Sequence, residues 1–398
     1  MVTIADRIDL LGTETAFAVS AEANAFAAQG NKVYPFHLGD INLPTPSTVV
    51  EGSWKALHDG KTGYCPNAGI PQLREALAAD VSASHHVEYG PDNVAVQPGG
   101  KPTIGKFILA LMNPVDEVLY PNPGYPIYES QIEFNGGVAM PYGYVEGESN
   151  FRLNFQSIER AITPMTRLLI LNDLQNPTGA ECSVEEHERL AELVRKHDLY
   201  VLADEAYFDM RYEGTSRSFV EQPGMAERTV ILYTFSKRFA MTGWRLGASI
   251  GPKEIIDVIS KINVNDESCS NHFIQYGAVA GLTGDQSEVE AIRDTLHQRR
   301  DALAAGLNSI AGVRTYVPSA TFYLYPNVTE AMANLGMNDY EEFRRAVLHN
   351  TGVSFTNRLH FGRVGPDEPD KHIRFAYSGI DVEEIEEGVA KMKAYLES

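Results

Sequence analysis

The sequence is poor in cysteine and has no long run of apolar residues. Only three of its 398 residues are cysteines, Cys65, Cys182 and Cys269, and their spacing matches neither a disulfide framework nor a metal-binding motif. No apolar stretch approaches the roughly 20 residues that a membrane-spanning helix needs. The segment 1–12 mixes acidic and basic residues without an apolar core, so we expect no secretory signal. These absences predict a cytoplasmic protein that does not enter a membrane.

Basic residues are also scarce. The chain has 33 Lys and Arg against 53 Asp and Glu, which gives a formal net charge of −20. A surface of this sign repels nucleic acids and anionic membranes, so we expect neither as a partner. The charge does not exclude an anionic cofactor, because a phosphate is bound by a local group of donors whatever the net charge.

The middle of the chain alternates short apolar runs with helical stretches. This alternation predicts an α/β fold in which a mainly parallel sheet is wrapped by helices. The apolar runs are 94–97, 117–120, 167–172, 200–204 and 229–234, and the helical stretches include 103–111 and 185–196. Ligands of such sheets bind beyond the carboxyl ends of the strands, where polar residues of this chain gather.

The last hundred residues mix strands and helices differently and predict a smaller α+β domain. We expect helices at 298–307, 341–349 and 382–397 and strands at 321–325 and 373–377. The length of the chain also favours two domains. We therefore predict a large domain over 46–295, a small domain over 296–398, and an N-terminal arm over 1–45 that joins the small domain or crosses to a partner chain.

The most informative fragment follows the apolar run 229–234. Thr234-Phe-Ser-Lys237 is followed by Gly243, Arg245 and Gly247. A lysine at a strand end, flanked by hydroxyl groups and an arginine, suits a Schiff base beside a phosphate, with Ser236 and Arg245 as phosphate ligands. A Ser-Lys pair alone is common on surface loops and would favour that interpretation. With the following glycines and arginine, the Schiff-base site is the favoured interpretation.

A second fragment, Val201-Leu-Ala-Asp-Glu-Ala-Tyr207, ends another apolar run on an acid. Burying Asp204 without a partner would be costly, and a pyridinium nitrogen would supply that partner. Tyr207, three residues later, would reach the phenolic oxygen of the same ring. The alternative for Asp204 or Glu205 is an N-cap of the next segment, and for this fragment alone the N-cap is favoured.

Three weaker signals accompany these two. In Asn172-Asp-Leu-Gln-Asn-Pro-Thr-Gly179 the turn would aim the Asn176 amide at a cofactor, although an ordinary turn is equally compatible. Gln97-Pro-Gly-Gly-Lys101 joins a strand to a helix, and its backbone N–H groups would form an anion site. Tyr125 would stack on a ring, or belong to the core.

Taken together and in this order, the fragments resemble the class I/II aminotransferases of fold type I, which are relatives of aspartate aminotransferase. The resemblance covers nearly the whole chain, from Leu38-Gly39 through Gly63-Tyr64 to His372-Ile-Arg-Phe375. It implies a pyridoxal-phosphate-dependent enzyme that moves an amino group from an L-amino acid to a 2-oxo acid by a ping-pong mechanism. It also implies a homodimer with shared active sites.

The resemblance implies roles for the residues around the cofactor ring. Lys237 resembles the Schiff-base lysine that also moves the proton at the substrate Cα. Asp204 resembles the partner of the pyridinium nitrogen. Asn176 and Tyr207 resemble the ligands of the ring oxygen, and Tyr125 is similar to the stacking aromatic residue.

Further roles concern the anionic groups. Gly100 and Lys101, through backbone N–H groups, and the side chains of Ser236 and Arg245 resemble the phosphate ligands. Tyr64 resembles a tyrosine that reaches the phosphate of the neighbouring subunit.

Arg374 resembles the arginine that forks onto the substrate α-carboxylate, a task for which lysine is a poor substitute, and Gly39 is similar to a glycine at the same carboxylate.

The match departs from the common pattern in four segments. A second proline is missing from 172–176, and a Pro-Gly turn is missing near 353–358. Thr321 replaces a usual glycine or alanine, and no proline follows Asp40. Because these segments lie near the substrate in the family, they leave the substrate open.

An alternative function keeps the cofactor but changes the reaction, as in a fold-type-I lyase, decarboxylase or oxidase. A non-catalytic regulator would need a basic helix-turn-helix extension, for which the chain has no room. For a distal carboxylate of the substrate, the candidate cations include Arg7, Arg358 and Arg363, whereas Phe17, Tyr34 and Tyr128 would line an apolar pocket.

Overall fold

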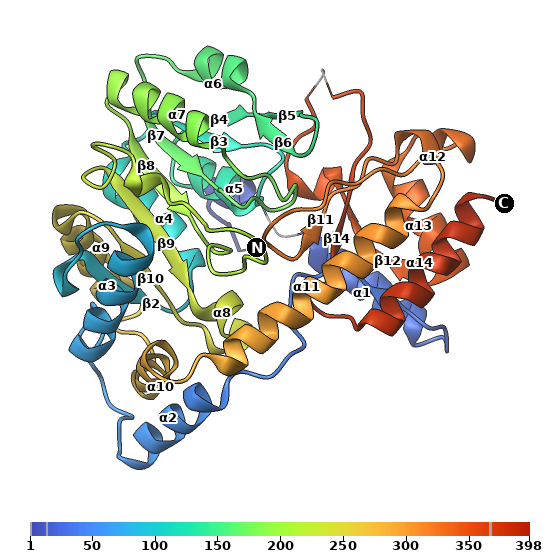
Figure 1. Cartoon of the computed structure of the whole chain (residues 1–398). Coiled ribbons are helices and arrows are strands. Elements are labelled where there is room, and N and C mark those ends of the chain that lie inside the picture. Colours follow the sequence, from blue (N-terminus) through green and yellow to red (C-terminus); the bar gives the residue numbers. More distant parts are fainter. Residues whose placement is uncertain (1, 13–14, 366–367) are drawn as a thin grey trace.

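The computed structural model describes residues 2–12, 15–365 and 368–398. Its centre is a seven-stranded sheet in the order β2-β10-β9-β8-β7-β3-β4 (Figure 1). All strands are parallel except β10, which is antiparallel to both of its neighbours. The strands are β2 (Val94–Gln97), β3 (Glu117–Pro121), β4 (Val138–Tyr142), β7 (Thr166–Leu171), β8 (Tyr200–Asp204), β9 (Thr229–Thr234) and β10 (Gly247–Ile250). The predicted sheet wrapped by helices is confirmed.

Helices cover both faces of this sheet because its strands are apolar on both sides. On one face, α4 (Lys101–Leu111), α5 (Ile127–Phe134) and α9 (Lys253–Asp266) share a core with the strands. On the other face, α6 (Phe155–Ala161) and α7 (Val184–Lys196) pack at one end of the sheet, and α3 (Pro71–His85) and α10 (His272–Thr283) pack at the other.

The helix α2 (Ser47–His58) lies against α10, and the short α8 (Phe235–Arg238) follows β9 directly. A hairpin of β5 (Tyr144–Glu146) and β6 (Phe151–Leu153) lies outside the main sheet.

The C-terminal elements form a second group around a three-stranded sheet in the order β11-β14-β13. The strands of this group are β11 (Tyr323–Leu324), β12 (Val353–Ser354), β13 (Thr356–Asn357) and β14 (Ile373–Ala376). The helices are α11 (Ser287–Asn308), α12 (Thr329–Asn334), α13 (Tyr340–Thr351) and α14 (Val382–Leu396), with the 3-10 turn η5 (Arg358–Phe361).

From α1 (Ala16–Ala27) onward the N-terminal segment lies among these elements, whereas the preceding 3-10 turn η1 (Asp6–Leu10) packs against α5 of the large sheet. The helix α1 contacts α13 through an ion pair between Glu22 and Arg344, and β1 (Tyr34–Pro35) pairs with β12 (Figure 1). The domain boundary near residue 295 stays a prediction, because α11 runs through that position without a break.

Two predicted elements differ clearly in extent, whereas several others differ by one or two residues at an end. The helix expected at 298–307 begins eleven residues earlier, at Ser287. The strand expected at 321–325 shrinks to two residues because Thr321 has φ +70°, which an extended strand cannot accommodate. Within the described ranges, no helix is both long and apolar enough to cross a membrane.

Candidate active site

A cavity of about 590 Å³ opens at the carboxyl ends of the parallel strands, between the large sheet and the C-terminal elements. The fold explains its place, since β7, β8 and β9 all end at the same edge and α4 begins there. Eleven of the twelve predicted site residues line this cavity: Gly39, Gly100, Lys101, Tyr125, Asn176, Asp204, Tyr207, Ser236, Lys237, Arg245 and Arg374. Residues that are distant in the sequence therefore share one site.

The twelfth predicted residue, Tyr64, lies outside the cavity. Its side chain is 89% exposed, in the segment between α2 and α3. This position makes no contribution to the cavity of its own chain.

Lys237 lies in α8, directly after β9, and lines the cavity. Thr234 begins this turn, because its hydroxyl accepts a hydrogen bond from the Ser236 N–H at 3.2 Å. The half-buried Lys237 donates from Nζ to the carbonyl oxygen of Gly39 at 3.0 Å. Its ammonium group also lies 5.1 Å from the ring centroid of Phe322. The amine thus points into the cavity, toward residues from the N-terminal segment.

Asp204 is buried at the end of β8, where its carboxylate accepts hydrogen bonds from neutral donors. The Tyr128 hydroxyl donates to Oδ2 at 2.5 Å, and the Ala206 N–H donates to Oδ1 at 3.2 Å. Burial raises the pKa of Asp204 to about 6 despite these bonds. A protonated pyridine nitrogen would compensate the carboxylate charge, so this donor set fits the ring of pyridoxal phosphate. The N-cap alternative is wrong, since a turn and not a helix follows β8.

The opposite end of the cavity is suited to an anion. The helix α4 begins at Lys101, so N–H groups of its first turn face the site. Gly99 has φ +108°, and a Cβ there would collide with the guanidinium of Arg245. Arg245 is fixed by a bond from Nη1 to the Thr242 carbonyl at 2.8 Å. Glycine, helix terminus and arginine together form a cradle that fits the phosphate group.

Arg374 extends from β14 and is almost fully buried. Its guanidinium donates to Oδ1 of Asn176 at 3.0 Å and to the carbonyl oxygen of His37 at 2.9 Å. The ring centroid of Tyr323 in β11 lies 4.5 Å from the central carbon of the guanidinium, and that of Phe361 in η5 lies 4.8 Å from it. This cage orients a bidentate cation at the cavity wall.

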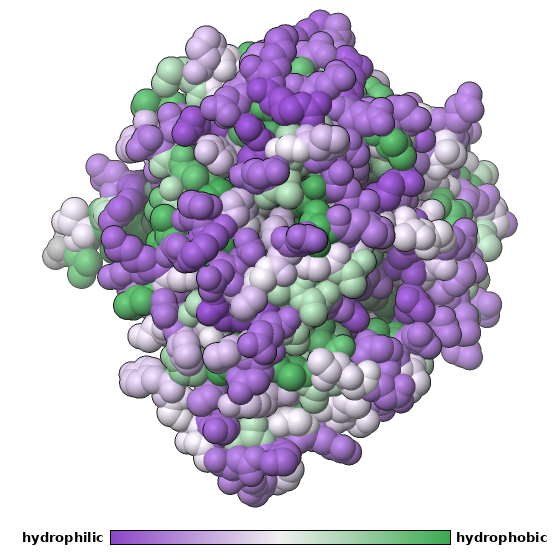
Figure 2. Space-filling view, turned by 60° about the vertical axis from the view of Figure 1, so that its left-hand side comes forward, coloured by the Kyte–Doolittle hydropathy of each residue, from purple (hydrophilic) through white to green (hydrophobic). Residues whose placement is uncertain are grey.

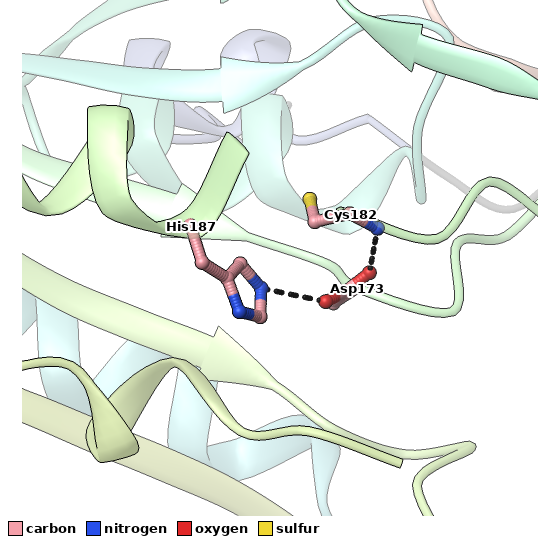
Figure 3. A group of neighbouring side chains, drawn as sticks. All are labelled: Asp173, Cys182 and His187. Carbon is pink, nitrogen blue, oxygen red and sulfur yellow. Dashed lines mark hydrogen bonds and ion pairs between the residues drawn. The ribbon is translucent and has the colours of Figure 1, made fainter. Parts of the chain in front are cut away.

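The loop that presents Asn176 is held by a partly buried contact between Asp173 and His187. Asp173 accepts from the N–H groups of Leu174 at 2.9 Å and Cys182 at 2.8 Å, and His187 on α7 lies 2.8 Å from its second oxygen (Figure 3). Asp173, Cys182 and His187 are all residue types that bind metals. Their potential ligand atoms lie within 4.8 Å of one another, but burial raises the pKa of the Cys182 thiol well above its usual value, which disfavours the thiolate that a metal ion would bind. The arrangement is that of a clamp on the loop.

Several residues of the cavity carried no clear signal in the sequence. Tyr323, Phe361 and His360 line it, and the first two lie against Arg374, yet all three belong to segments with no motif. Their role depends on contacts between distant segments, which local patterns do not record. The unusual Thr321, two residues before Tyr323, was the only sign that this turn is special.

The candidate cations for a distal carboxylate are not in the cavity. Arg358 is buried in bonds with Glu368, and Arg363 pairs with Glu129 on the surface. Arg7 lies beside the ring of Phe134.

The aromatic candidates differ from one another. Phe17 and Tyr128 do line the cavity, and Tyr128 also binds Asp204. Tyr34 instead belongs to the core of the C-terminal group.

Comparisons with known proteins agree on one family. The model of "Aminotransferase class I and II" matches residues 34–392. The aspartate/prephenate aminotransferase of Thermus thermophilus is 34% identical over 94% of this chain and 93% of its own. The asparagine–oxo-acid transaminase of Streptococcus mutans is 30% identical over 100% of both chains. The solved aspartate aminotransferase from Thermus thermophilus with maleate matches with a TM-score of 0.90 and 30% identity, over 99% of this chain and 100% of that one.

These relatives are all transaminases, so the alternative of a lyase, decarboxylase or oxidase gains no support. The parallel sheet, the cavity at its edge and the match over residues 34–392 lead to the same conclusion. The chain belongs to the class I and II aminotransferases, a family of enzymes that depend on pyridoxal phosphate.

Proposed function

We propose that this aminotransferase exchanges an amino group between an L-amino acid and a 2-oxo acid in two half-reactions at Lys237. The observation that carries the proposal is the convergence of Lys237, Asp204 and Arg374 on one cavity. The reaction requires proton transfer, charge compensation and carboxylate binding. The Lys237 amine, the buried Asp204 carboxylate and the Arg374 guanidinium are suited to these tasks in that order.

When bound, pyridoxal phosphate supplies an electron sink for negative charge at the substrate Cα. Lys237 Nζ is the group placed to remove the Cα proton and to return it to a neighbouring carbon. Its present partner, the carbonyl oxygen of Gly39, holds the amine over the cavity. Asp204 keeps a positive charge on the ring nitrogen by ionic pairing, and Tyr207 and Asn176 bind the ring oxygen.

Arg374 binds the α-carboxylate, which the amino acid and the oxo acid have in common. A site that binds this shared group serves both half-reactions in turn, which is the basis of a ping-pong mechanism. The Tyr323 and Phe361 rings stop the guanidinium from turning toward water.

We further infer that aspartate is the donor to test first. Arg245 and Arg374 serve the phosphate and the α-carboxylate, and Lys237 serves proton transfer. The Lys101 side chain, whose Nζ lies 5.7 Å from the ring centroid of Tyr125, is a further cation at the wall. It would attract a distal carboxylate, and several relatives are named for aspartate.

The proposal includes a homodimer in which Tyr64 reaches the phosphate of the neighbouring subunit. The surface in Figure 2 is mainly hydrophilic. Against that background α2 exposes Val50, Trp54 and Leu57, close in sequence to the exposed Tyr64. An apolar helix face of this kind is suited to burial against a second copy. We also infer a cytoplasmic location, which the three free thiols support.

The half-reaction tests the proposal without a second substrate. The holoenzyme is mixed with single L-amino acids, and the absorbance of the bound cofactor and the released oxo acid are measured together. We expect aspartate to convert the absorbance band and to release one oxo acid per site. Release of ammonia, carbon dioxide or peroxide instead, or no conversion with any amino acid, would contradict it.

A further inference from the structure

The side chain of Tyr323 contacts two groups to which the proposed function gives separate tasks. Its hydroxyl oxygen lies 2.8 Å from that of Tyr207, and the two rings meet edge to face with centroids 5.4 Å apart. The same ring lies 4.5 Å from the central carbon of the Arg374 guanidinium. One residue of the cavity wall therefore touches both the proposed ligand of the cofactor's ring oxygen and the proposed binder of the substrate carboxylate.

The backbone before Tyr323 is strained and firmly held. Thr321 has φ +70°, a conformation that a β-branched residue rarely adopts, and it is fully buried. Its carbonyl oxygen accepts from the hydroxyls of Tyr212 and of Tyr377, the latter at 3.0 Å, and its N–H donates to the Met210 carbonyl at 2.9 Å. Strain of this kind persists only where the surroundings impose it, and it is commonest at functional sites.

The space for the Tyr323 hydroxyl comes from a glycine. A Cβ at Gly39 would collide with this hydroxyl and would also come within 3.2 Å of the Phe322 ring. The carbonyl oxygen of the same glycine accepts the bond from Lys237. The positions of the lysine amine and of Tyr323 are therefore coupled through one residue.

The direction of the hydrogen bond between the tyrosines follows from the number of protons. Burial raises the pKa of Tyr207 well above its usual value, so Tyr207 keeps its single proton. If Tyr207 donates that proton to the cofactor's ring oxygen, its own oxygen must accept from Tyr323. In a chain of hydrogen bonds each bond polarises the next, so Tyr323 makes Tyr207 a stronger donor.

We propose that Tyr323 is a positioning residue for amino transfer: its hydroxyl donates to Tyr207 while its ring orients Arg374. It thereby links the ligand of the cofactor's ring oxygen to the site of the substrate carboxylate. This inference rests on the role of Tyr207 in the proposed function.

The test separates the hydroxyl from the ring. The holoenzymes of Tyr323→Phe, Tyr323→Leu, Tyr207→Phe and the double variant Tyr207→Phe/Tyr323→Phe are compared with the wild type. Tyr34→Phe is the matched control, because it removes one hydroxyl from a buried tyrosine that bonds to Lys391 and does not line the cavity. The measurements are the pH midpoint of the absorbance change of bound pyridoxal phosphate, the dissociation constant of maleate, and kcat and KM for aspartate.

Loss of the hydroxyl is expected to move the absorbance midpoint and to leave carboxylate binding intact. In Tyr323→Phe the midpoint should rise by roughly 0.3 pH unit, with lower kcat and little change in KM or in maleate binding. In Tyr323→Leu, maleate should in addition bind roughly fivefold more weakly, because the guanidinium loses its ring. On the Tyr207→Phe background, Tyr323→Phe should cause no further shift of the midpoint, and Tyr34→Phe should behave as the wild type.

The inference is overturned if Tyr323→Phe shifts the midpoint equally with and without Tyr207, or does not shift it at all. It is also overturned if Tyr34→Phe causes the same shift, since the effect would then be unspecific. If Tyr207→Phe itself leaves the midpoint unchanged, the failure lies in the proposed role of Tyr207 and not in that of Tyr323.

Discussion

Burial shifts the pKa values of two residues at the site, Asp204 and His37, in opposite directions. Asp204 is an acid in an apolar wall, so its charged form is disfavoured and its pKa is raised to about 6. His37 is a base buried beside the Arg374 guanidinium, so burial and then the nearby charge lower its pKa to about 4. The ionised Asp204 weakens the protein without its cofactor, whereas the neutral His37 is compatible with a cationic neighbour.

Replacing Asp204 by Asn should therefore separate stability from activity. Above pH 6 the carboxylate is ionised in both the folded and the unfolded state, and it opposes folding by the full shift of its pKa. We expect Asp204→Asn to raise the unfolding free energy of the apoprotein at pH 8 by roughly 2 kcal/mol. We expect kcat to fall on the order of 100-fold, because the ring nitrogen loses its ionic partner. Urea unfolding of the apoprotein and steady-state kinetics of the holoenzyme measure the two effects, and a stable variant with full activity would contradict the role of Asp204.

His37 predicts a loss of stability in acid. Between pH 6.5 and about 4 the unfolded chain binds a proton at this histidine and the folded chain does not, so stability falls as pH falls through this window. The contribution reaches about 3 kcal/mol at the lower end. Urea unfolding of the wild type and of His37→Gln at pH 7, 5 and 4 isolates it by difference. Equal pH dependence in the two proteins would show that His37 is not the group responsible.

At the scale of elements, the loop after β7 shows how this chain fixes a functional side chain. In the segment 172–176, Leu174 has φ +53°. Asp173 accepts the N–H of Leu174, and it joins that end of the loop to Cys182 and to His187. These side-chain contacts hold the loop that carries Asn176, the partner of Arg374.

Removing His187 should lower kcat/KM by more than the loss of folding stability alone would cause. His187→Ala leaves the partly buried Asp173 carboxylate without its imidazole partner, which costs on the order of 1–3 kcal/mol. We expect the loop to shift and kcat/KM to fall roughly tenfold, since small displacements of binding groups are costly. The control is Val194→Ala, a packing loss on the same helix and in the core that α7 shares with β7 and β8. Thermal unfolding and kinetics at 25 °C should show comparable destabilisation but reduced activity only in the histidine variant; equal activities would refute the clamp.

The elements themselves follow from the sequence where its pattern is local. The strands at 200–204 and 229–234 were predicted to the residue, since their apolar runs end on Asp204 and on Thr234. The wall formed by Tyr323, Phe361 and His360 was not predicted, because it forms where η5 and β11 meet the N-terminal segment. Arg358 was misplaced for the same reason: only the fold reveals that Glu368 binds it.

At the scale of the whole molecule, the cavity lies where two groups of elements meet. Asp204 ends a strand of the large sheet and Lys237 lies in α8, directly after β9. Arg374 comes from the C-terminal sheet and Gly39 from the N-terminal segment. The site is therefore sensitive to how these parts are placed. In the proposed homodimer the site also depends on the placement of a second copy of the chain, because Tyr64 and one face of α2 are exposed and available for contact with it.

Mixed dimers test the contribution of Tyr64 across subunits. Tyr64→Ala and Lys237→Ala are each expected to be nearly inactive as pure proteins. Unfolding and refolding an equal mixture should restore about a quarter of the wild-type activity, because half of the dimers are mixed and each of these has one complete site. Activity that stays at the level of the two separate proteins would exclude a shared site.

The covalent attachment of pyridoxal phosphate at Lys237 is the central claim. Reduction of the holoenzyme with borohydride fixes the cofactor on its lysine, and mass spectrometry of the resulting peptides identifies that lysine. The account predicts the added mass on the peptide that contains Lys237, at one cofactor per chain, and its loss in Lys237→Ala. The added mass on another lysine, such as Lys101, or on none, would contradict the account.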